Sequence, residues 1–382
     1  MWSYLLKGDI DFIMAKSQVY FTDMRCNFET NLLDKMRKLI DAAGIANIDF
    51  NRKYAAIKLH FGEPGNLSFL RPNFSKVVTD RVKELGGKPF LTDCGTLYPG
   101  GRTNALDHIE AAYVNGYSPF STGVHIIIGD GLKGTDDVVV PINGGKYLTT
   151  ANIGRAIMDA DVFISLTHFK GHEGTGFGGT LKNVGMGCGS RAGKMKMHNE
   201  GKPFVDEELC TGCRKCSAFC AHDAFVYREG TASIDHAKCV GCGFCIGSCN
   251  FLAISNEFDS SNDMLNYKII EYAKAVLDGR PSFHISVVNQ VSPYCDCHSE
   301  NDAAIIPDIG MFASFDPVAI DHACIDAVNA APPIMTSIMG ERDLSRRDHF
   351  TDVHPTTDWR QQIRHGEEIG LGNGDYELIT LK

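Results

Sequence analysis

The sequence of 382 residues lacks the features that mark membrane and nucleic-acid binding. No stretch approaches the roughly 18 consecutive apolar residues that a membrane-spanning helix needs. No basic patch is present either, because lysines and arginines gather only in short groups such as Arg346-Arg347, and 37 basic against 47 acidic residues leave a net charge of −10. We therefore expect neither a membrane nor a nucleic acid as a main partner.

The first residues do not have the character of an export signal. Lys7, Asp9 and Asp11 interrupt what would be its apolar core. We expect residues 1–15 to be an N-terminal extension without structure of its own, with Met14 as an alternative start. A cytoplasmic location follows as the expectation.

Short apolar strands alternate with amphipathic helices on both sides of a cysteine-rich segment. Strands are predicted over 18–21, 54–60, 89–92, 124–128, 162–167, 283–289 and 309–314. Helices are predicted over 29–43, 72–85, 104–114, 153–160, 264–276 and 317–328. A hairpin of 138–142 and 146–149 is expected to turn at Asn143-Gly144-Gly145. The alternation predicts an α/β fold, a mostly parallel sheet with helices on both faces, while the polar residues from 342 onward predict little.

The chain is rich in cysteine, with fourteen in total. In a small exported domain they would indicate disulfides, but this chain is large and has no export signal. Eight of them form two runs with the spacing Cys-x2-Cys-x2-Cys-x3-Cys, Cys210, Cys213, Cys216 and Cys220 in the first and Cys239, Cys242, Cys245 and Cys249 in the second. Zinc sites with four cysteines are usually built from two separated Cys-x2-Cys pairs. The runs therefore predict two 4Fe–4S clusters.

The two runs resemble those of the two-cluster bacterial ferredoxins, in which the fourth cysteine of each run ligates the other cluster. That resemblance implies one cluster on Cys210, Cys213, Cys216 and Cys249, and another on Cys239, Cys242, Cys245 and Cys220. It also implies a short hairpin of 224–228 and 231–234, within an inserted α+β module over 206–257. One departure is that Ala221 and Asn250 stand where these runs usually have proline.

Two segments are candidates for a further site in the α/β domain. The Gly-rich stretch 171–193 begins after a buried strand, and its turn either packs against the module or binds a ligand. Lys170 and Lys182 either bind an anionic substrate or face solvent, and Lys182 is a candidate catalytic residue. Cys295 and Cys297 follow a predicted strand end, where ligands bind in open parallel sheets. This pair either chelates an additional metal, with His298, His168 or His172 completing the set, or is a pair of free thiols in a loop.

Asp316 and Asp321 are the carboxylates that we consider as catalytic candidates. Asp316 precedes Pro317 at the start of a predicted helix, which is the pattern of an N-cap, and Asp321 lies one turn further on the same helix. A cap and a helix-face aspartate are the simpler explanation of the two.

Three segments resemble the signatures of the domain-of-unknown-function family 362. They are Lys58-Leu59-His60-Phe61-Gly62, Thr180-Leu181-Lys182-Asn183 and Phe315-Asp316-Pro317-Val318-Ala319-Ile320-Asp321. The resemblance implies an uncharacterised iron–sulfur protein in which α/β segments flank an inserted ferredoxin module. The implied division is an α/β domain over 16–205 and 258–341, the module between these parts, and a C-terminal tail over 342–382.

The function that these observations favour is a redox relay, with the clusters passing electrons between a partner protein and a site in the α/β domain. Such a protein would be an oxidoreductase, although the sequence names no substrate. Two alternatives stay open. The chain could be a non-enzymatic electron carrier or adaptor that docks on a partner oxidoreductase, or its clusters could be structural or oxygen-sensing. An enclosed pocket at the strand ends would favour the relay, and a flat surface the adaptor.

Overall fold

The computed structural model describes residues 16–381, apart from 98–99, 200–202, 219, 221, 240–244, 246–248, 250, 252 and 257–261. The predicted extension 1–15 and the predicted ligand Cys242 lie outside the described residues.

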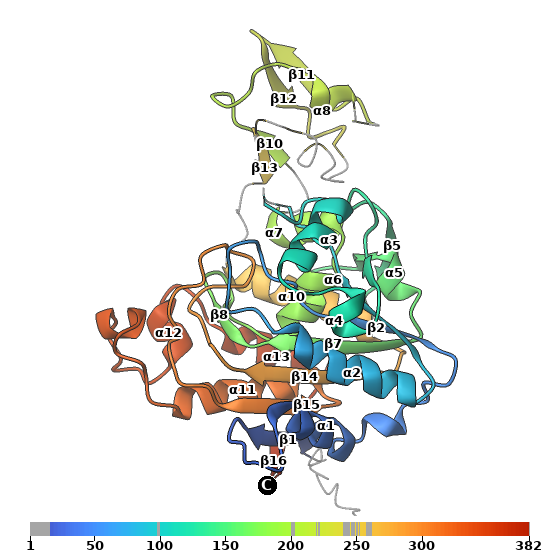
Figure 1. Ribbon diagram of the computed structural model, residues 1–382. Coiled ribbons are helices and arrows are strands. Elements are labelled where there is room, and N and C mark those ends of the chain that lie inside the picture. The colour runs from blue at the N-terminus through green and yellow to red at the C-terminus, as the bar shows by residue number, and fades with distance from the viewer. Residues whose placement is uncertain are drawn as a thin grey trace, which may run out of the picture.

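An eight-stranded sheet forms the centre of the larger body of the molecule (Figure 1). Its order is β16-β1-β15-β14-β7-β2-β3-β4. These strands are β1 (Ser17–Asp23), β2 (Tyr54–Lys58), β3 (Lys88–Asp93), β4 (Ile126–Ile128), β7 (Val162–His168), β14 (Ser282–Val288), β15 (Gly310–Ser314) and β16 (Tyr376–Thr380). Only β15 runs antiparallel to its neighbours among the described strands of this sheet. The prediction of a mostly parallel sheet is thereby confirmed.

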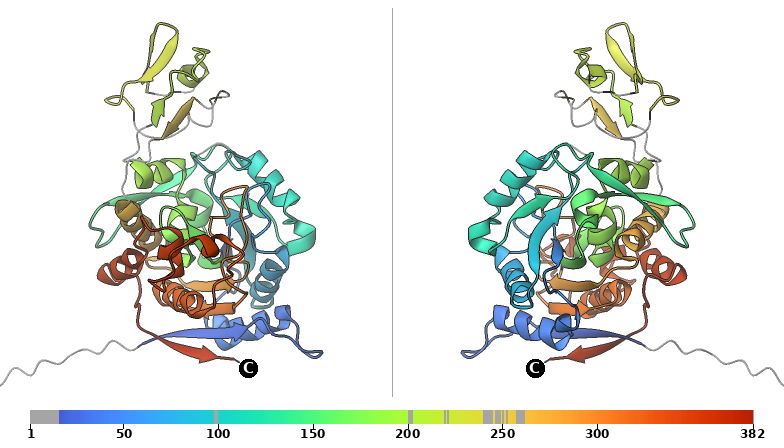
Figure 2. Two further views of the ribbon diagram at one scale, coloured as in Figure 1. Left: turned by 90° about the vertical axis from the view of Figure 1, so that its left-hand side faces the viewer. Right: turned by 90° about the vertical axis from the view of Figure 1, so that its right-hand side faces the viewer.

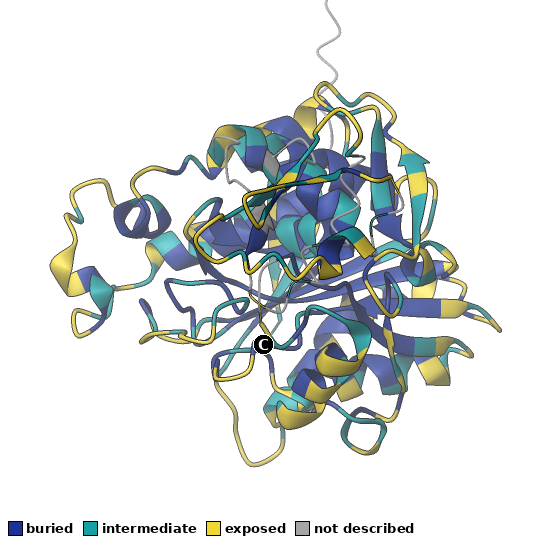
Figure 3. Cartoon of the chain, turned by 90° about the horizontal axis from the view of Figure 1, so that it is seen from above, coloured by how far each residue is buried: buried dark blue, intermediate teal, exposed yellow. Residues whose placement is uncertain are grey.

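Helices cover both faces of this sheet, as predicted. One face packs against α1 (Leu32–Ala42), α2 (Pro72–Glu84), α3 (Ala105–Val114) and α4 (Pro119–Thr122). The other packs against α5 (Arg155–Met158), α6 (Thr180–Cys188), α10 (Asn262–Leu277), α11 (Pro317–Ala330) and α13 (Arg360–Glu368). Alternation along β2 sends Ala55 and Ile57 to the first core and Ala56 to the second. Figure 3 shows buried residues along the sheet and exposed ones on the outer rim.

The predicted hairpin exists, but its second strand lies further along the chain. β5 (Asp137–Pro141) pairs with β6 (Thr150–Gly154), so that Val140 lies opposite Ala151. Residues 146–149 are instead part of the loop, because the buried carboxylate of Glu271 accepts hydrogen bonds from the backbone N–H groups of Lys146, Tyr147 and Leu148. The helix predicted from residue 153 accordingly starts later, at α5.

The C-terminal residues contain more structure than their polar sequence predicts. After a 3-10 turn, η2 (Ile338–Glu341), the chain forms α12 (His349–Val353) and α13. It ends in β16, which pairs in parallel with β1 at the edge of the sheet. Trp359 and Ile363 are buried in the core that α11 also contributes to. The segment 342–382 is therefore integrated into the α/β body.

The cysteine-rich segment forms a small lobe beyond α7 (Arg191–Asn199), at the end of the molecule away from β1 and β16 (Figures 1 and 2). Its base is a pair of antiparallel strands, β10 (Pro203–Val205) and β13 (Ile254–Asn256). Its tip is the hairpin of β11 (Phe225–Arg228) and β12 (Thr231–Ile234), close to the predicted hairpin, with α8 (Lys215–Ala218) beside it. Among the described residues, no helix is long and apolar enough to cross a membrane.

Candidate functional site

The loops that follow the parallel strands meet at one edge of the sheet. Lys58, Asp93 and His168 are the last residues of β2, β3 and β7, and the loop after β14 carries Cys295 and Cys297. Together with residues of α6, α7 and α10, these loops line a cavity of about 630 Å³. It is lined by Glu63, Pro64, Thr96, Leu97, Gly100, His172, Glu173, Lys182, Met186, Lys194, His198, Leu265, Ile269, Cys297, His298, Ser299 and Glu300. The carboxyl ends of the strands therefore form a pocket, as the open parallel sheet predicts.

The Gly-rich stretch forms a wall of this cavity. It folds into a two-stranded hairpin of β8 (Lys170–His172) and β9 (Gly176–Gly178) and then turns into α6. The turn brings His172 and Lys182 to the same cavity. The stretch thus does more than pack against the cysteine-rich lobe, because it supplies side chains to the pocket.

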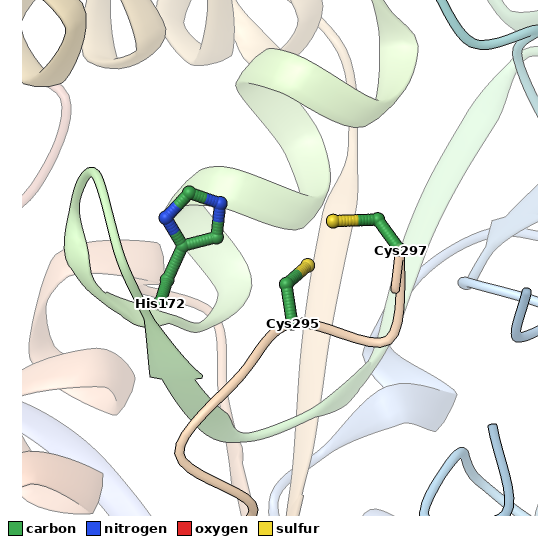
Figure 4. A group of neighbouring side chains, drawn as sticks. All are labelled: His172, Cys295 and Cys297. Carbon is green, nitrogen blue, oxygen red and sulfur yellow. The ribbon is translucent and has the colours of Figure 1, made fainter. Parts of the chain in front are cut away.

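His172, Cys295 and Cys297 form a close group (Figure 4). Their side-chain donor atoms, one ring nitrogen and two sulfur atoms, all lie within 4.8 Å of one another. The two cysteines belong to a turn that is closed by a hydrogen bond of 3.0 Å from the N–H of His298 to the carbonyl of Cys295. In number, spacing and softness this donor set fits a metal ion.

The ring of His172 is fixed by the backbone that follows it. Its Nδ1 accepts the N–H groups of Gly174 at 3.0 Å and Thr175 at 3.1 Å. Burial lowers the pKa of His172 to about 4, so the ring is neutral at pH 7. A neutral ring has one proton, and because Nδ1 accepts hydrogen bonds, that proton is assigned to Nε2, which faces the two sulfur atoms (Figure 4).

Lys182 brings a positive charge to the sulfur pair. Its Nζ donates to Sγ of Cys295 at 3.3 Å. Burial opposes the charged form, but the neighbouring Cys295, Cys297 and Glu173 raise the pKa of Lys182 above its usual range. The lysine also lines a smaller cavity next to the first, of about 60 Å³, to which both cysteines contribute.

His168, the other histidine considered as a ligand, lies outside this group. Its Nδ1 contacts Asp296 at 2.9 Å, and its Nε2 lies 2.8 Å from the carbonyl oxygen of Asn289. The buried Asp296 also pairs with Lys170 at 3.3 Å. His168 therefore anchors the turn between the two cysteines instead of joining them.

Sequence reasoning missed a set of buried charges beneath the site. Lys58 Nζ lies 3.0 Å from Asp93 Oδ1 and donates to Asn183 Oδ1 at 2.8 Å. Arg102 Nε donates to Glu63 Oε2 at 2.7 Å, with the arginine 1% exposed. The sequence did contain a signal for this set, because Lys58 and Asp93 end two neighbouring buried strands. Charged residues are rarely buried without a partner, so the two could have been predicted to form an ion pair.

The two candidate carboxylates have structural surroundings. Asp316 caps α11 by accepting N–H groups from Val318 and Ala319, and its other oxygen accepts from Ser17 Oγ and the N–H of Asn373. Asp321 accepts the N–H groups of Thr180 and Leu181. Neither residue lines the two cavities.

Four cysteines from the two runs surround one small cavity in the lobe. Cys210, Cys213 and Cys216 of the first run line it together with Cys249 of the second. This is the set that the resemblance to ferredoxins grouped on one cluster. Of the other set, Cys220, Cys239 and Cys245 are described, and none of these thiols is in a disulfide.

The comparison with protein families bears on a large part of the α/β body. The model of a domain of unknown function, DUF362, matches residues 55–326, which is more than half of the chain. The chain belongs to the DUF362 family. The match spans the described α/β segments before and after the cysteine-rich lobe, and it confirms the family resemblance of the sequence.

Individual relatives are more distant or shorter matches. A curated relative, the thylakoid-associated protein sll1697 of Synechocystis, is 30% identical over 139 residues, which are 35% of this chain and 36% of the relative. The match thus spans about a third of the relative's length.

Two solved structures resemble the chain in part. The lactate racemase apoprotein of Thermoanaerobacterium thermosaccharolyticum has a TM-score of 0.36 and 10% identity over 72% of this chain and 51% of its own. A Thermotoga maritima protein has a TM-score of 0.38 and 12% identity, over 78% and 58%. Likenesses of this size carry no argument about activity.

Proposed function

We propose that this DUF362 protein is a cytoplasmic iron–sulfur redox protein. In this proposal the lobe over 206–257 holds two 4Fe–4S clusters and exchanges electrons between a partner protein and the cavity of the α/β domain. The observation that carries the proposal is the grouping of Cys210, Cys213, Cys216 and Cys249 around one cavity. Three ligands from one run and the fourth from the other is the arrangement of two-cluster ferredoxins.

Backbone donors at the cysteine sulfur atoms support the same proposal. The N–H of Ala232 points to Sγ of Cys210 at 3.4 Å, and that of Ala224 to Sγ of Cys220 at 3.5 Å. Such hydrogen bonds offset the negative charge of ligating thiolates and tune the reduction potential of a bound cluster. When bound, the clusters supply one-electron chemistry, and the protein supplies their position and surroundings.

The packing between the lobe and the α/β body supports an electron path to the cavity. Leu97 and Met195 of the body share a buried apolar cluster with Cys216, Ala232 and Ile254 of the lobe. Leu97 also lines the large cavity. Cys216, from a predicted ligand set, and Leu97, from the cavity wall, therefore belong to one cluster of packed side chains. The strand ends form a cavity and not a flat surface, which favours a terminal site within this chain over an adaptor that only docks on another enzyme.

Metal analysis of the chain purified without oxygen tests the proposal. We expect about eight iron atoms and as many sulfide ions per chain, two clusters of four. We also expect an electron paramagnetic resonance signal after reduction. Cys213→Ser should lower the iron content and change that signal, because Cys213 belongs to the predicted ligand set. The matched control is Cys26→Ser, an exposed cysteine of the α/β body, which should change neither. Zinc in place of iron, or no metal, would refute the proposal.

A further inference from the structure

We infer that Cys295 and Cys297 form a redox-active dithiol, at which the electron path of the proposed function ends. The inference rests on that function for its source of electrons, but the dithiol itself stands on the geometry of the cavity. Its substrate would be a small disulfide or thiol, because a dithiol exchanges electrons with its substrate through sulfur.

The turn that holds the two cysteines places them for reversible bonding. Both are thiols in this structure, and their sulfur atoms lie within 4.8 Å. The turn is closed at its ends by the hydrogen bond between Cys295 and His298 and held from inside by Asp296, whose carboxylate binds His168 and Lys170. A disulfide needs sulfur atoms to approach to about 2 Å, so the two side chains must move toward each other within the anchored turn.

The groups around the sulfur pair are hydrogen-bond donors. Lys182 donates to Cys295, and the assigned proton on Nε2 of His172 faces both sulfur atoms. The neighbouring Cys297 and burial raise the pKa of Cys295 although Lys182 acts against this, so Cys295 stays a thiol. The donors and the positive charge therefore favour a thiolate at Cys297, and the thiolate is the form that attacks a disulfide. A metal bound at Nε2 would have to displace that proton while Nδ1 still accepts two backbone N–H groups. Metal-bound histidines usually donate from their second nitrogen, so this ring suits a thiol site better.

The two cysteines differ in their access to the cavity. Cys297 is half-buried and lines the large cavity, whereas Cys295 is 1% exposed and lines only the smaller one. Cys297 is therefore the sulfur that meets the substrate. Its thiolate attacks a disulfide RS–SR, forming a mixed disulfide and releasing one RS⁻. Cys295 then attacks Cys297, releasing the second RS⁻ and leaving the Cys295–Cys297 disulfide. The two thiol protons leave with the products, which become two RSH.

Regeneration of the dithiol requires two electrons and two protons. A one-electron donor protein, acting through the cysteine-rich lobe, would supply these electrons one at a time. Two predicted clusters can hold two electrons, which is the number that one disulfide takes up. This match between a pair of one-electron carriers and a two-electron couple is the reason for placing the end of the path here.

Mass spectrometry after alkylation tests the couple on the full-length chain. The anaerobically purified protein is equilibrated in mixtures of reduced and oxidised dithiothreitol, trapped with an alkylating reagent, and digested. We expect the Cys295–Cys297 disulfide to appear as the mixture becomes more oxidising, with a single midpoint. Cys297→Ser should abolish it and leave the iron content unchanged. The matched control is Cys324→Ala, a buried cysteine of α11 outside both cavities, which should leave the midpoint in place.

Two outcomes would overturn the inference. One is the absence of this disulfide in every mixture. The other is a stoichiometric metal in the purified wild type that is lost in Cys297→Ser, since the thiols would then be metal ligands. Iron content separates these failures from failure of the proposed function. A full iron content without the disulfide removes only the dithiol, and a disulfide in a chain that binds no iron removes only the relay.

Discussion

The carboxylate of Asp321 reaches from α11 to the first residues of α6. It accepts the N–H groups of Thr180 at 2.7 Å and Leu181 at 2.8 Å, and so closes the Gly-rich loop just before Lys182. A Cβ at Gly179 would lie 2.5 Å from the same carboxylate, so only glycine leaves room for this contact. Burial raises the pKa of Asp321 to about 7, although the two N–H donors and the charge of Lys170 act against it.

This pKa makes the stability of the protein depend on pH near neutrality. The unfolded chain releases the proton at its ordinary value, so between pH 4 and 7 the folded chain holds more protons. The contribution of protonated Asp321 to the free energy of unfolding is complete below that window and is lost as the pH rises through about 7. Asp321→Asn cannot titrate and satisfies only one of the two N–H groups, so we expect a loss of about 1–3 kcal/mol at pH 5 that shrinks toward pH 8.

Urea unfolding at several pH values measures this difference. The comparison variant is Asp316→Asn, in which one oxygen still caps α11 but the amide nitrogen cannot accept the N–H of Asn373. Its loss of stability should not shrink toward pH 8. An unchanged slope in Asp321→Asn would contradict the assignment.

At the scale of residues, the sequence predicts those contacts that form between residues close together in the chain. Asp316 and Pro317 mark a helix start, and the structure confirms the cap. The contact of His172 with Cys295 and Cys297 depends instead on two strand-end loops far apart in the chain. The strand-end rule predicted the region, but it did not decide between His168 and His172, because their surroundings are set by Asp296 and by the backbone after His172.

At the scale of elements, α6 and α10 pack closely against each other. A Cβ at Gly185 would lie 2.0 Å from the carbonyl oxygen of Ile269, so the two backbones touch at this glycine. The contact holds α6, and with it Lys182, against the sheet. Gly185→Ala should therefore push the helices apart and lower the stability by about 1–3 kcal/mol or more.

Thermal unfolding measures the loss of stability, and the rate at which a thiol reagent alkylates Cys295 reports on the position of Lys182. The shift of α6 should also weaken the contact of Lys182 with Cys295. Because the positive charge of Lys182 favours the reactive thiolate, we expect slower alkylation of Cys295. Gly279→Ala is a control of the same chemistry near the end of α10, where nothing lies within 4 Å of an added Cβ, although its positive φ carries a cost of its own. Equal alkylation rates in Gly185→Ala and the wild type would show that the close contact does not position Lys182.

Elements were predictable where their apolar pattern is local and strong. The buried strands β7 and β14 and the amphipathic α1 fall close to their predicted ranges. The predicted second strand of the β5–β6 hairpin began too early, directly after Gly144-Gly145. The loop continues beyond these glycines because the carboxylate of Glu271, from the distant helix α10, accepts hydrogen bonds from its backbone. The strand β16 was missed because it gains its stability from pairing with β1, which no local pattern in a polar segment reveals.

At the scale of the whole molecule, the cysteine-rich lobe enters and leaves the α/β body at one place. β10 and β13 pair from Pro203 opposite Asn256 to Val205 opposite Ile254, and Asp206 N–H donates to the carbonyl of Ala253 at 2.7 Å. The two ends of the lobe are thus already joined by hydrogen bonds. An insertion of this form can be removed at little cost in chain entropy, because a short linker closes the gap.

Replacing residues 207–252 by a short Gly/Ser turn should therefore leave the α/β body folded. We expect cooperative unfolding with a modest loss of stability, since Leu97 and Met195 lose their apolar neighbours in the lobe. Circular dichroism and urea unfolding measure the fold, and alkylation trapping measures whether the Cys295–Cys297 disulfide still forms. We expect the disulfide still to form in thiol mixtures. A one-electron donor such as reduced methyl viologen should reduce it more slowly in the shortened chain than in the full-length chain. All residues that line the cavity belong to the α/β body, so the cavity should survive the replacement. Loss of cooperative unfolding would mean that the lobe is part of the core, and the division into host and insertion would be wrong.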